Sequence, residues 1–254
     1  MCFETDSHPP IPPIRGAALD AVDVTVTCPD GTRVATYQVH AAAPTGAGIV
    51  ICPDVRGLHP FYEELALRFA EAGVDSIAFD YFSRTAGTGK RDASFEYMPH
   101  VRRTRIESID QDVAAAAAQL RSDRSIERLY TVGFCFGGRV SFLQARHAEL
   151  GLSGVIGFYG VPAGPHRSGI PAPIDEVPRF TCPVLGLFGG ADQGIPPEMR
   201  EAFDQALTDA GINHRLVVYP GAPHSFFDRS FEEHAEASAN AWREVLAFMG
   251  IPAS

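Results

Sequence analysis

Two patterns of apolar and polar residues divide the chain. Between Ala21 and His40 the two kinds alternate on both sides of the turn signal Pro29-Asp30-Gly31, which predicts a β-hairpin over 21–28 and 33–40. From residue 47 onward, short runs that are wholly apolar replace the alternation, beginning with Ala47–Cys52. Such runs are typical of strands buried on both faces of a sheet.

Segments with helical spacing of apolar residues separate these runs. The further strands are predicted over 76–79, 129–133, 154–159, 183–188 and 215–219. The helices are predicted over 61–72, 105–120, 138–150, 196–210 and 232–249. Strands that alternate with helix-length spacers require right-handed crossovers. The sequence therefore predicts an α/β fold with a mostly parallel central sheet, helices on both faces and an N-terminal antiparallel hairpin.

The ends of the chain differ from this core. Residues 1–20 include the run Pro9-Pro10-Ile11-Pro12-Pro13, which neither a helix nor a central strand accepts, so we expect an extended N-terminal arm. Residues 21–254 are predicted to form a single domain. Within it, the segment 161–179 is rich in Pro and Gly and lacks a period, as expected of a lid or an active-site rim.

Composition excludes several classes of protein. The 254 residues are 45% hydrophobic and 20% charged, unlike a disordered chain, and the formal net charge of −10 argues against a nucleic-acid partner. No apolar run approaches the roughly 18–20 residues of a membrane span, and the N-terminus lacks the pattern of a secretory signal. An odd number of cysteines, five, favours reduced thiols and a cytoplasmic protein. No CxxC or HExxH spacing is present, so we expect neither a metal nor a cofactor. A monomer or a small homo-oligomer fits these properties.

The clearest chemical signal is Gly133-Phe134-Cys135-Phe136-Gly137-Gly138, which lies directly between a predicted strand and a predicted helix. A turn this tight needs small flanking residues and lifts its central side chain into a cleft. Cys135 then lies at a helix N-terminus, which favours the thiolate, and the amide of Phe136 points toward a developing oxyanion. A buried structural cysteine between packing glycines is the alternative for Cys135 alone. The strand–turn–helix context favours the nucleophile.

A nucleophilic thiol needs a base and an acid that orients the base. Asp192 follows one predicted strand and His224 follows the last, which gives the order nucleophile, acid, histidine of α/β-hydrolases. Taken singly, an Asp that caps a loop and a surface His are the alternatives. The loop after residue 52 is expected to supply a second oxyanion amide, that of Val55. Asp54 beside it is either a solvated turn residue or a second carboxylate near the thiol.

These motifs, together with Gly-Gly-Ala-Asp at 189–192 and Ala-Pro-His-Ser-Phe at 222–226, resemble the dienelactone hydrolase family (carboxymethylenebutenolidases) over 22–249. The resemblance implies an α/β-hydrolase fold, a Cys135–His224–Asp192 triad, and oxyanion amides from Phe136 and Val55. The family has a glutamate in the position of Asp54, where it contacts the resting thiol and helps to generate the thiolate.

The substrate side departs from the family. An arginine that holds the substrate carboxylate lies four residues after the family's catalytic histidine, whereas this chain has Asp228 there. An aspartate is expected to repel a carboxylate, so dienelactone specificity is not expected to carry over. Tyr81, Arg84 and Tyr159 follow predicted strands and are candidates for lining the cleft, with packing or surface roles as the alternative.

The predicted activity is hydrolysis of a small-molecule ester or lactone through Cys135. Thioesterase or general carboxylesterase activity on the same scaffold is the first alternative, and a non-catalytic ligand-binding relative is the second. A redox-sensing thiol is a third, because an accessible cysteine of low pKa is easily oxidised.

Overall fold

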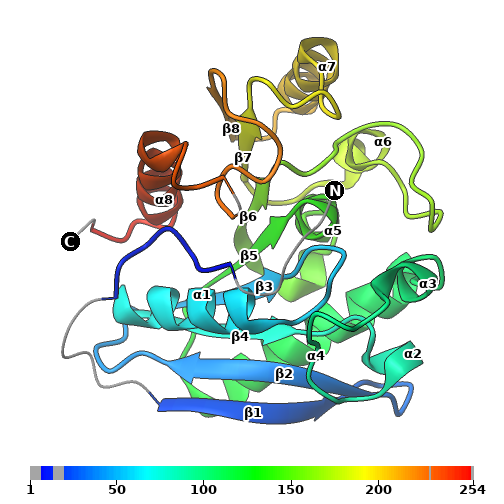
Figure 1. The fold of residues 1–254 in the computed structure, drawn as a ribbon, viewed down its shortest axis with the longest axis vertical. Coiled ribbons are helices and arrows are strands. Elements are labelled where there is room, and N and C mark those ends of the chain that lie inside the picture. The colour runs from blue at the N-terminus through cyan, green and yellow to red at the C-terminus, as the bar shows by residue number, and fades with distance from the viewer. Residues whose placement is uncertain (1–6, 14–19, 229, 253–254) are drawn as a thin grey trace.

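The computed structural model describes residues 7–13, 20–228 and 230–252 (Figure 1). Its strands are β1 (Asp20–Thr27), β2 (Arg33–His40), β3 (Ala47–Cys52), β4 (Val74–Phe79), β5 (Arg128–Phe134), β6 (Leu152–Phe158), β7 (Val184–Gly189) and β8 (His214–Tyr219). Its helices are α1 (Pro60–Glu71), α2 (Ser83–Ala86), α3 (Tyr97–Val101), α4 (Ile106–Asp123), α5 (Phe136–Gln144), α6 (Pro173–Glu176), α7 (Pro197–Asp209) and α8 (Ala235–Phe248), with 3₁₀ turns at Ala148–Leu150 and Val177–Arg179.

The strands form one eight-stranded sheet in the order β1-β2-β4-β3-β5-β6-β7-β8. β1 pairs antiparallel with β2 and β2 with β4, whereas the pairs from β4 across to β8 are parallel. Every residue of β3, β4 and β7 is buried, whereas β1 is mostly exposed. The wholly apolar runs thus mark the central strands, and the predicted fold class with its N-terminal hairpin is confirmed.

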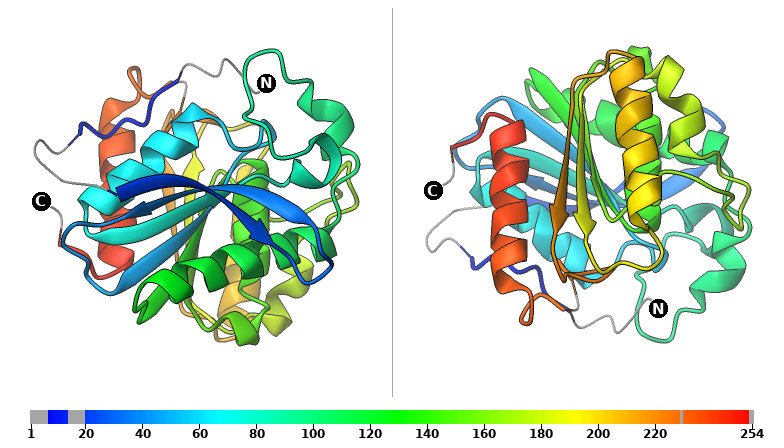
Figure 2. Two further views of the ribbon diagram at one scale, coloured as in Figure 1. Left: turned by 90° about the horizontal axis from the view of Figure 1, so that it is seen from below. Right: turned by 90° about the horizontal axis from the view of Figure 1, so that it is seen from above.

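Helices cover both faces of the sheet (Figure 2). On one face α1 and α8 lie together, and the rings of Phe69 and Trp242 approach to 4.9 Å between centroids. On the other face Gln144 of α5 donates to Asp110 of α4 at 3.0 Å, and Phe142 of α5 packs against Phe203 of α7. None of the helices in the described part of the chain has both the length and the apolar character needed to cross a membrane.

The structure departs from the predicted elements where segments are short. The helices α2, α3 and α6 were not predicted, because four or five residues are too few to show a helical period. The predicted helix over 138–150 ends at Gln144, and a separate 3₁₀ turn covers 148–150. Of the predicted N-terminal arm, 7–13 lies beside α1, where His8 bonds to Glu64 at 2.8 Å and Ile11 packs on the core. Residues 1–6 and 14–19 of that arm lie outside the described residues.

The parallel register aligns the carboxyl ends of the central strands. Cys52 pairs with Gly133, Phe134 with Phe158, and Gly189 with Tyr219. The loops that follow β3, β5, β6, β7 and β8 therefore begin at the same edge of the sheet, where open α/β sheets bind their ligands.

Candidate active site

The turn between β5 and α5 is very tightly built around Cys135. This residue has φ 55° and ψ −112°, and its amide donates to the carbonyl of Phe158 at 3.0 Å. A Cβ on Gly133 would lie 1.8 Å from the carbonyl oxygen of Gly137, and one on Gly137 would lie 2.0 Å from that of Cys52. Only glycine fits at these two positions. The half-buried side chain of Cys135 is thereby fixed at the N-terminus of α5.

Backbone strain gathers at the same edge of the sheet. Among the described residues, three that are not glycine have positive φ: Cys135, Tyr159 at 38° and Ser225 at 60°. Tyr159 lies with its ring 4.9 Å from that of His224, and Ser225 directly follows this histidine. Strained conformations of this kind persist only where the surrounding structure holds them, and they concentrate at functional sites.

His224 and Asp192 form a close pair. The Nδ1 of His224 lies 2.6 Å from Oδ2 of Asp192, and Oδ1 of Asp192 accepts the amide of Gly194 at 2.9 Å. Asp192 is buried, whereas 31% of the His224 side chain is exposed. A carboxylate at Nδ1 favours the tautomer with its proton there and leaves Nε2 to exchange protons.

Cys135 and His224 line the same pocket, which has a volume of about 530 Å³. The wall comes from the loop after β3, from α3, from the start of α5 and from the long segment after β6. Its residues are Val55, Tyr97, Met98, Val101, Cys135, Phe136, Arg139, Val161, Pro165, His166, Arg167 and His224.

The two amides predicted for the oxyanion hole adjoin this pocket. Phe136 is the first residue of α5, so its N–H has no acceptor one helical turn back. The two residues after Val55 use their amides within the loop, because the N–H groups of Arg56 and Gly57 both donate to Asp54. The amide of Val55 has no hydrogen-bond acceptor in the described parts of the chain.

The pocket carries basic side chains in an otherwise acidic protein. Two arginines line it, Arg139 and Arg167, and no carboxylate does so among the described residues. Burial, together with both arginines, lowers the pKa of His166 to about 4, so this imidazole is neutral at pH 7. The local field therefore favours an anionic group in the pocket.

A buried ionic cluster ties two of these loops together. The Nη2 of Arg56 lies 2.5 Å from Oδ2 of Asp54 and 2.6 Å from Oδ2 of Asp228. All three side chains are at least 93% buried. Burial alone would raise the pKa of Asp54, but Arg56 holds it below its ordinary value. Burial raises the pKa of Asp228 despite the same guanidinium.

This cluster bears on two expectations. Asp54 is not a solvated turn residue, because Arg56 occupies both of its oxygens. Asp228 is buried, shares the guanidinium of Arg56 with Asp54 and is absent from the described lining of the pocket. The repulsion of a substrate carboxylate at this position stays a prediction.

The three predicted cleft residues lie behind or away from the pocket. Tyr81 is buried and donates its hydroxyl to the carbonyl of Pro53, so it supports the loop after β3 from behind. Tyr159 packs against His224 but is 1% exposed, and its hydroxyl has no partner among the described residues. Arg84 bonds through Nε to Asp112 at 2.9 Å and pairs with Asp30, so its interactions hold the hairpin against α4. None of the three is among the described residues that line the pocket.

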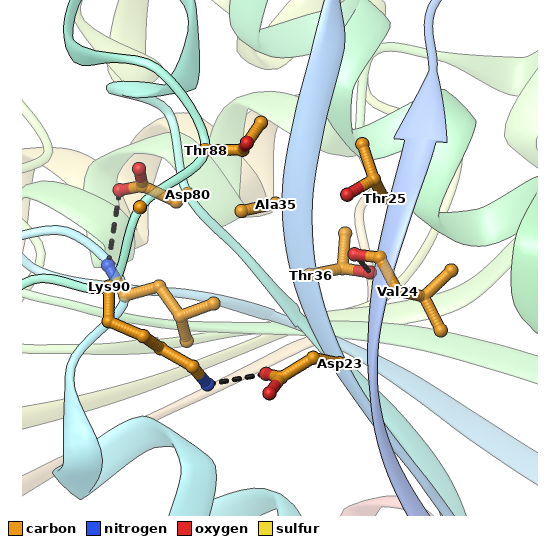
Figure 3. A pocket seen from close by; sticks show the side chains of 10 residues that line it. Asp23, Val24, Thr25, Ala35, Thr36, Asp80, Thr88 and Lys90 are labelled. Carbon is orange, nitrogen blue, oxygen red and sulfur yellow. Dashed lines mark hydrogen bonds and ion pairs between the residues drawn. The ribbon is translucent and has the colours of Figure 1, made fainter.

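A second, smaller pocket of about 180 Å³ lies between the hairpin and the loop after α2 (Figure 3). Lys90 pairs there with Asp23, while Asp80 binds Arg91 at 2.7 Å and accepts the amide of Leu58 at 3.2 Å. No sequence-predicted site residue is among its described lining. Its contacts support the outer end of the loop after β3.

Asp112, the buried partner of Arg84, is expected to make stability depend on pH. Burial raises its pKa to about 6, so the folded chain keeps a proton between about pH 4 and 6 that the unfolded chain has lost. This stabilisation is present at low pH and is lost as the pH rises through 6. The free energy of unfolding of the wild type, relative to Asp112→Asn, should fall by about 2–3 kcal/mol from pH 4 to pH 7. Urea titrations of both proteins measure it, and a constant difference would refute the assignment.

The eight-stranded sheet, the strained turn after β5 and the histidine–aspartate pair at its edge define an α/β-hydrolase. A sequence profile of the dienelactone hydrolase family matches residues 34–251. The chain belongs to the dienelactone hydrolase family, whose members hydrolyse ester or lactone bonds, which confirms the predicted family and enzyme class.

Individual relatives agree with this assignment. A "Putative carboxymethylenebutenolidase" of Methylorubrum extorquens is 30% identical over 233 residues, covering 89% of this chain and 79% of the relative. A "Probable 2-oxo-3-(5-oxofuran-2-ylidene)propanoate lactonase" of a Bradyrhizobium species is 26% identical over 246 residues, covering 91% and 94%. Among solved structures, a "Putative Dienelactone Hydrolase" from Klebsiella pneumoniae matches with a TM-score of 0.76 and 27% identity, over 92% of this chain and 99% of that one.

Arg56 and Arg139 are among the residues of this site that sequence reasoning missed. Arg56 lies two positions after Asp54. The available signal was that this chain lacks the family's arginine at position 228 but has an arginine at position 56. Arg139 is the single charged residue of α5, whose nine residues are all buried. A lone arginine in so apolar a helix was the corresponding signal.

Proposed function

We propose that the chain hydrolyses its ester or lactone substrate through a Cys135–His224–Asp192 triad. The observation that carries this proposal is the shared pocket. Cys135 reaches it from a strained turn at a helix N-terminus, and His224 reaches it with Nδ1 held at 2.6 Å by Asp192. A helix N-terminus lowers the pKa of a thiol in general, which suits a nucleophile.

In the first half-reaction, Nε2 of His224 takes the proton of the Cys135 thiol, the Sγ attacks the carbonyl carbon, and the C=O electron pair becomes an oxyanion. The amides of Phe136 and Val55 are the proposed donors to that oxyanion. When the oxyanion collapses, the C–O bond to the leaving group breaks and His224 delivers a proton to the leaving oxygen. A thioester remains on Cys135. With a lactone, the leaving hydroxyl stays attached to the acyl group.

In the second half-reaction, His224 removes a proton from water, whose oxygen attacks the thioester carbonyl. Collapse of this second oxyanion breaks the C–S bond and releases the carboxylic acid, and His224 returns its proton to the sulfur. Asp192 keeps the imidazole in one tautomer and stabilises its cation in both steps. No further reactant is needed.

For the substrate we propose a small lactone or ester that carries a carboxylate. The names of the two relatives describe lactones with a carboxymethylene or propanoate group. Arg167 lines the pocket here without a carboxylate among its described lining, and Asp228 is buried against Arg56. These charges support an anionic substrate. Because position 228 is an aspartate in this chain, other residues would bind that substrate.

Trapping of the acyl-enzyme tests the triad. The protein is mixed with p-nitrophenyl acetate, quenched in acid within the first turnovers, and analysed by intact mass and peptide mapping. We expect one acetyl group, on Cys135. Burial raises the pKa of Cys28 and Cys182 to about 12 and that of Cys52 still further, so these thiols serve as unreactive internal controls. Acetyl on a different residue during turnover would contradict the proposal.

A further inference from the structure

Arg139 binds an entire segment of backbone from one position in α5. Its own amide donates to the carbonyl of Cys135 at 3.2 Å, so it lies one helical turn after this residue. Its guanidinium donates to four backbone carbonyls, all in the segment after β6: Pro171 at 3.0 Å, Gly164 at 2.8 Å, Ile170 at 3.0 Å and Val161 at 3.5 Å.

A guanidinium is costly to bury in this way. Arg139 is 2% exposed, and its hydrogen bonds in the described structure go to carbonyls rather than to a carboxylate. Burial lowers its pKa to about 10, against a weaker opposing attraction from Asp175. Core positions normally exclude such a charge unless its hydrogen bonds are satisfied. The planar fork of arginine is suited to several acceptors at fixed positions.

The bound segment, 161–171, forms one wall of the pocket. It contributes Val161, Pro165, His166 and Arg167 to the lining, and the His166 ring lies 5.1 Å from that of Phe136. The segment contains no helix or strand. Within it, Gly169 donates to the carbonyl of His166 at 2.9 Å, and Pro162 accepts the amide of Ile174. The carbonyls near both of its ends and that of Gly164 converge on Arg139.

We propose that Arg139 is a positioning residue that fixes the 161–171 wall against the helix that starts beside Cys135, and thereby sets which acyl groups the pocket accepts. This inference rests on the proposed function, since it concerns the acyl substrate of that pocket. Arg139 acts through the wall and takes no part in bond making. The specificity of the site is then carried by the fork geometry of one side chain and not by its charge alone.

The test compares Arg139→Met and Arg139→Lys with the wild type on two neutral esters, p-nitrophenyl acetate and p-nitrophenyl hexanoate. A two-carbon acyl group offers much less surface for contact with the wall than a six-carbon one, so kcat/KM for acetate should stay within about threefold of the wild type. For hexanoate we expect kcat/KM to fall about tenfold, mainly through KM. Because lysine keeps the charge and loses the fork, both variants should behave alike.

Limited trypsin digestion measures directly how firmly the 161–171 wall is held, and it needs no substrate. Arg167 lies exposed inside the segment, and cleavage after it should be at least tenfold faster in both variants than in the wild type. Arg121→Met is the matched control, because Arg121 also donates to a backbone carbonyl, that of Leu150 at 2.8 Å, and is not part of the described pocket lining. It should leave both the ester profile and cleavage after Arg167 unchanged.

Equal losses on both esters, a lysine variant indistinguishable from the wild type, or unchanged cleavage after Arg167 would each overturn the role of Arg139. If the wild type hydrolyses neither ester and forms no acyl adduct, the proposed function fails instead. The digestion still decides whether Arg139 holds the wall.

Discussion

Replacement of Cys135 by alanine is expected to lower kcat for p-nitrophenyl acetate by about 10⁴-fold or more, because no other group in the proposed mechanism forms the acyl intermediate. KM should change little, since the alanine variant keeps the pocket wall and the oxyanion amides. Initial rates of nitrophenolate release measure the effect. Residual turnover at the level of the amides and binding alone is expected to remain.

The fold of this variant should be intact. Alanine has the same backbone requirements as cysteine at φ 55°, and the glycines that make the turn possible are untouched. Cys182→Ala is the matched control, because it removes a buried thiol from the core outside the pocket and should retain wild-type turnover. If Cys135→Ala keeps more than a tenth of the wild-type rate, the cysteine is not the nucleophile.

Replacement of Arg56 by methionine is expected to destabilise the protein by about 3–5 kcal/mol at pH 8. The variant leaves Asp54 and Asp228 buried and without the guanidinium that lies 2.5 and 2.6 Å from their oxygens. Buried like charges raise the pKa of a carboxyl, so the folded variant retains a proton that the unfolded chain releases. Stability lost at pH 8 should therefore return as the pH falls toward 5.

In the wild type, the contribution of Asp54 to the free energy of unfolding depends on pH in the opposite direction. Arg56 holds the pKa of that carboxyl below its ordinary value, so its contribution is present at neutral pH and is lost only in acid. Urea unfolding at pH 5 and pH 8 measures the difference between the two proteins, which should shrink at the lower pH. Adding Asp54→Asn and Asp228→Asn to Arg56→Met should remove this pH dependence. A loss of equal size at both pH values would show that packing of the Arg56 stem, rather than charge, is responsible.

The order of strands and helices was predictable because burial leaves a direct record in the sequence. A strand covered on both faces is largely apolar, and β3 is apolar at every position, while the alternation in the hairpin reflects its one-sided cover. The Gly133–Gly138 motif was equally informative, since a Cβ at Gly133 or Gly137 would collide with backbone. Sterics of that kind permit one residue type and so can be recognised from a single sequence.

The polar interior of the site was not predictable in the same way. Arg56 and Asp228 lie 172 positions apart, and no local pattern indicates that their side chains meet. Arg84 follows a strand as a site residue would, yet its pairs with Asp30 and Asp112 hold it elsewhere. The sequence gives the position of a charged side chain along the chain, whereas its partner depends on packing between distant elements.

The bridge from Arg56 to Asp228 also bears on the order of events during folding. It joins the loop after the third strand to a loop that follows the last one, across 172 positions of chain. Contacts of such long range form only after the intervening loop has been closed, at an entropic cost that grows with its length. A nascent chain that has emerged only as far as α7 holds Cys135 and Asp192 but neither His224 nor Asp228. The thiol of Cys135 is thus present long before the histidine that would activate it. The site is completed only when β8 and the loop after it dock.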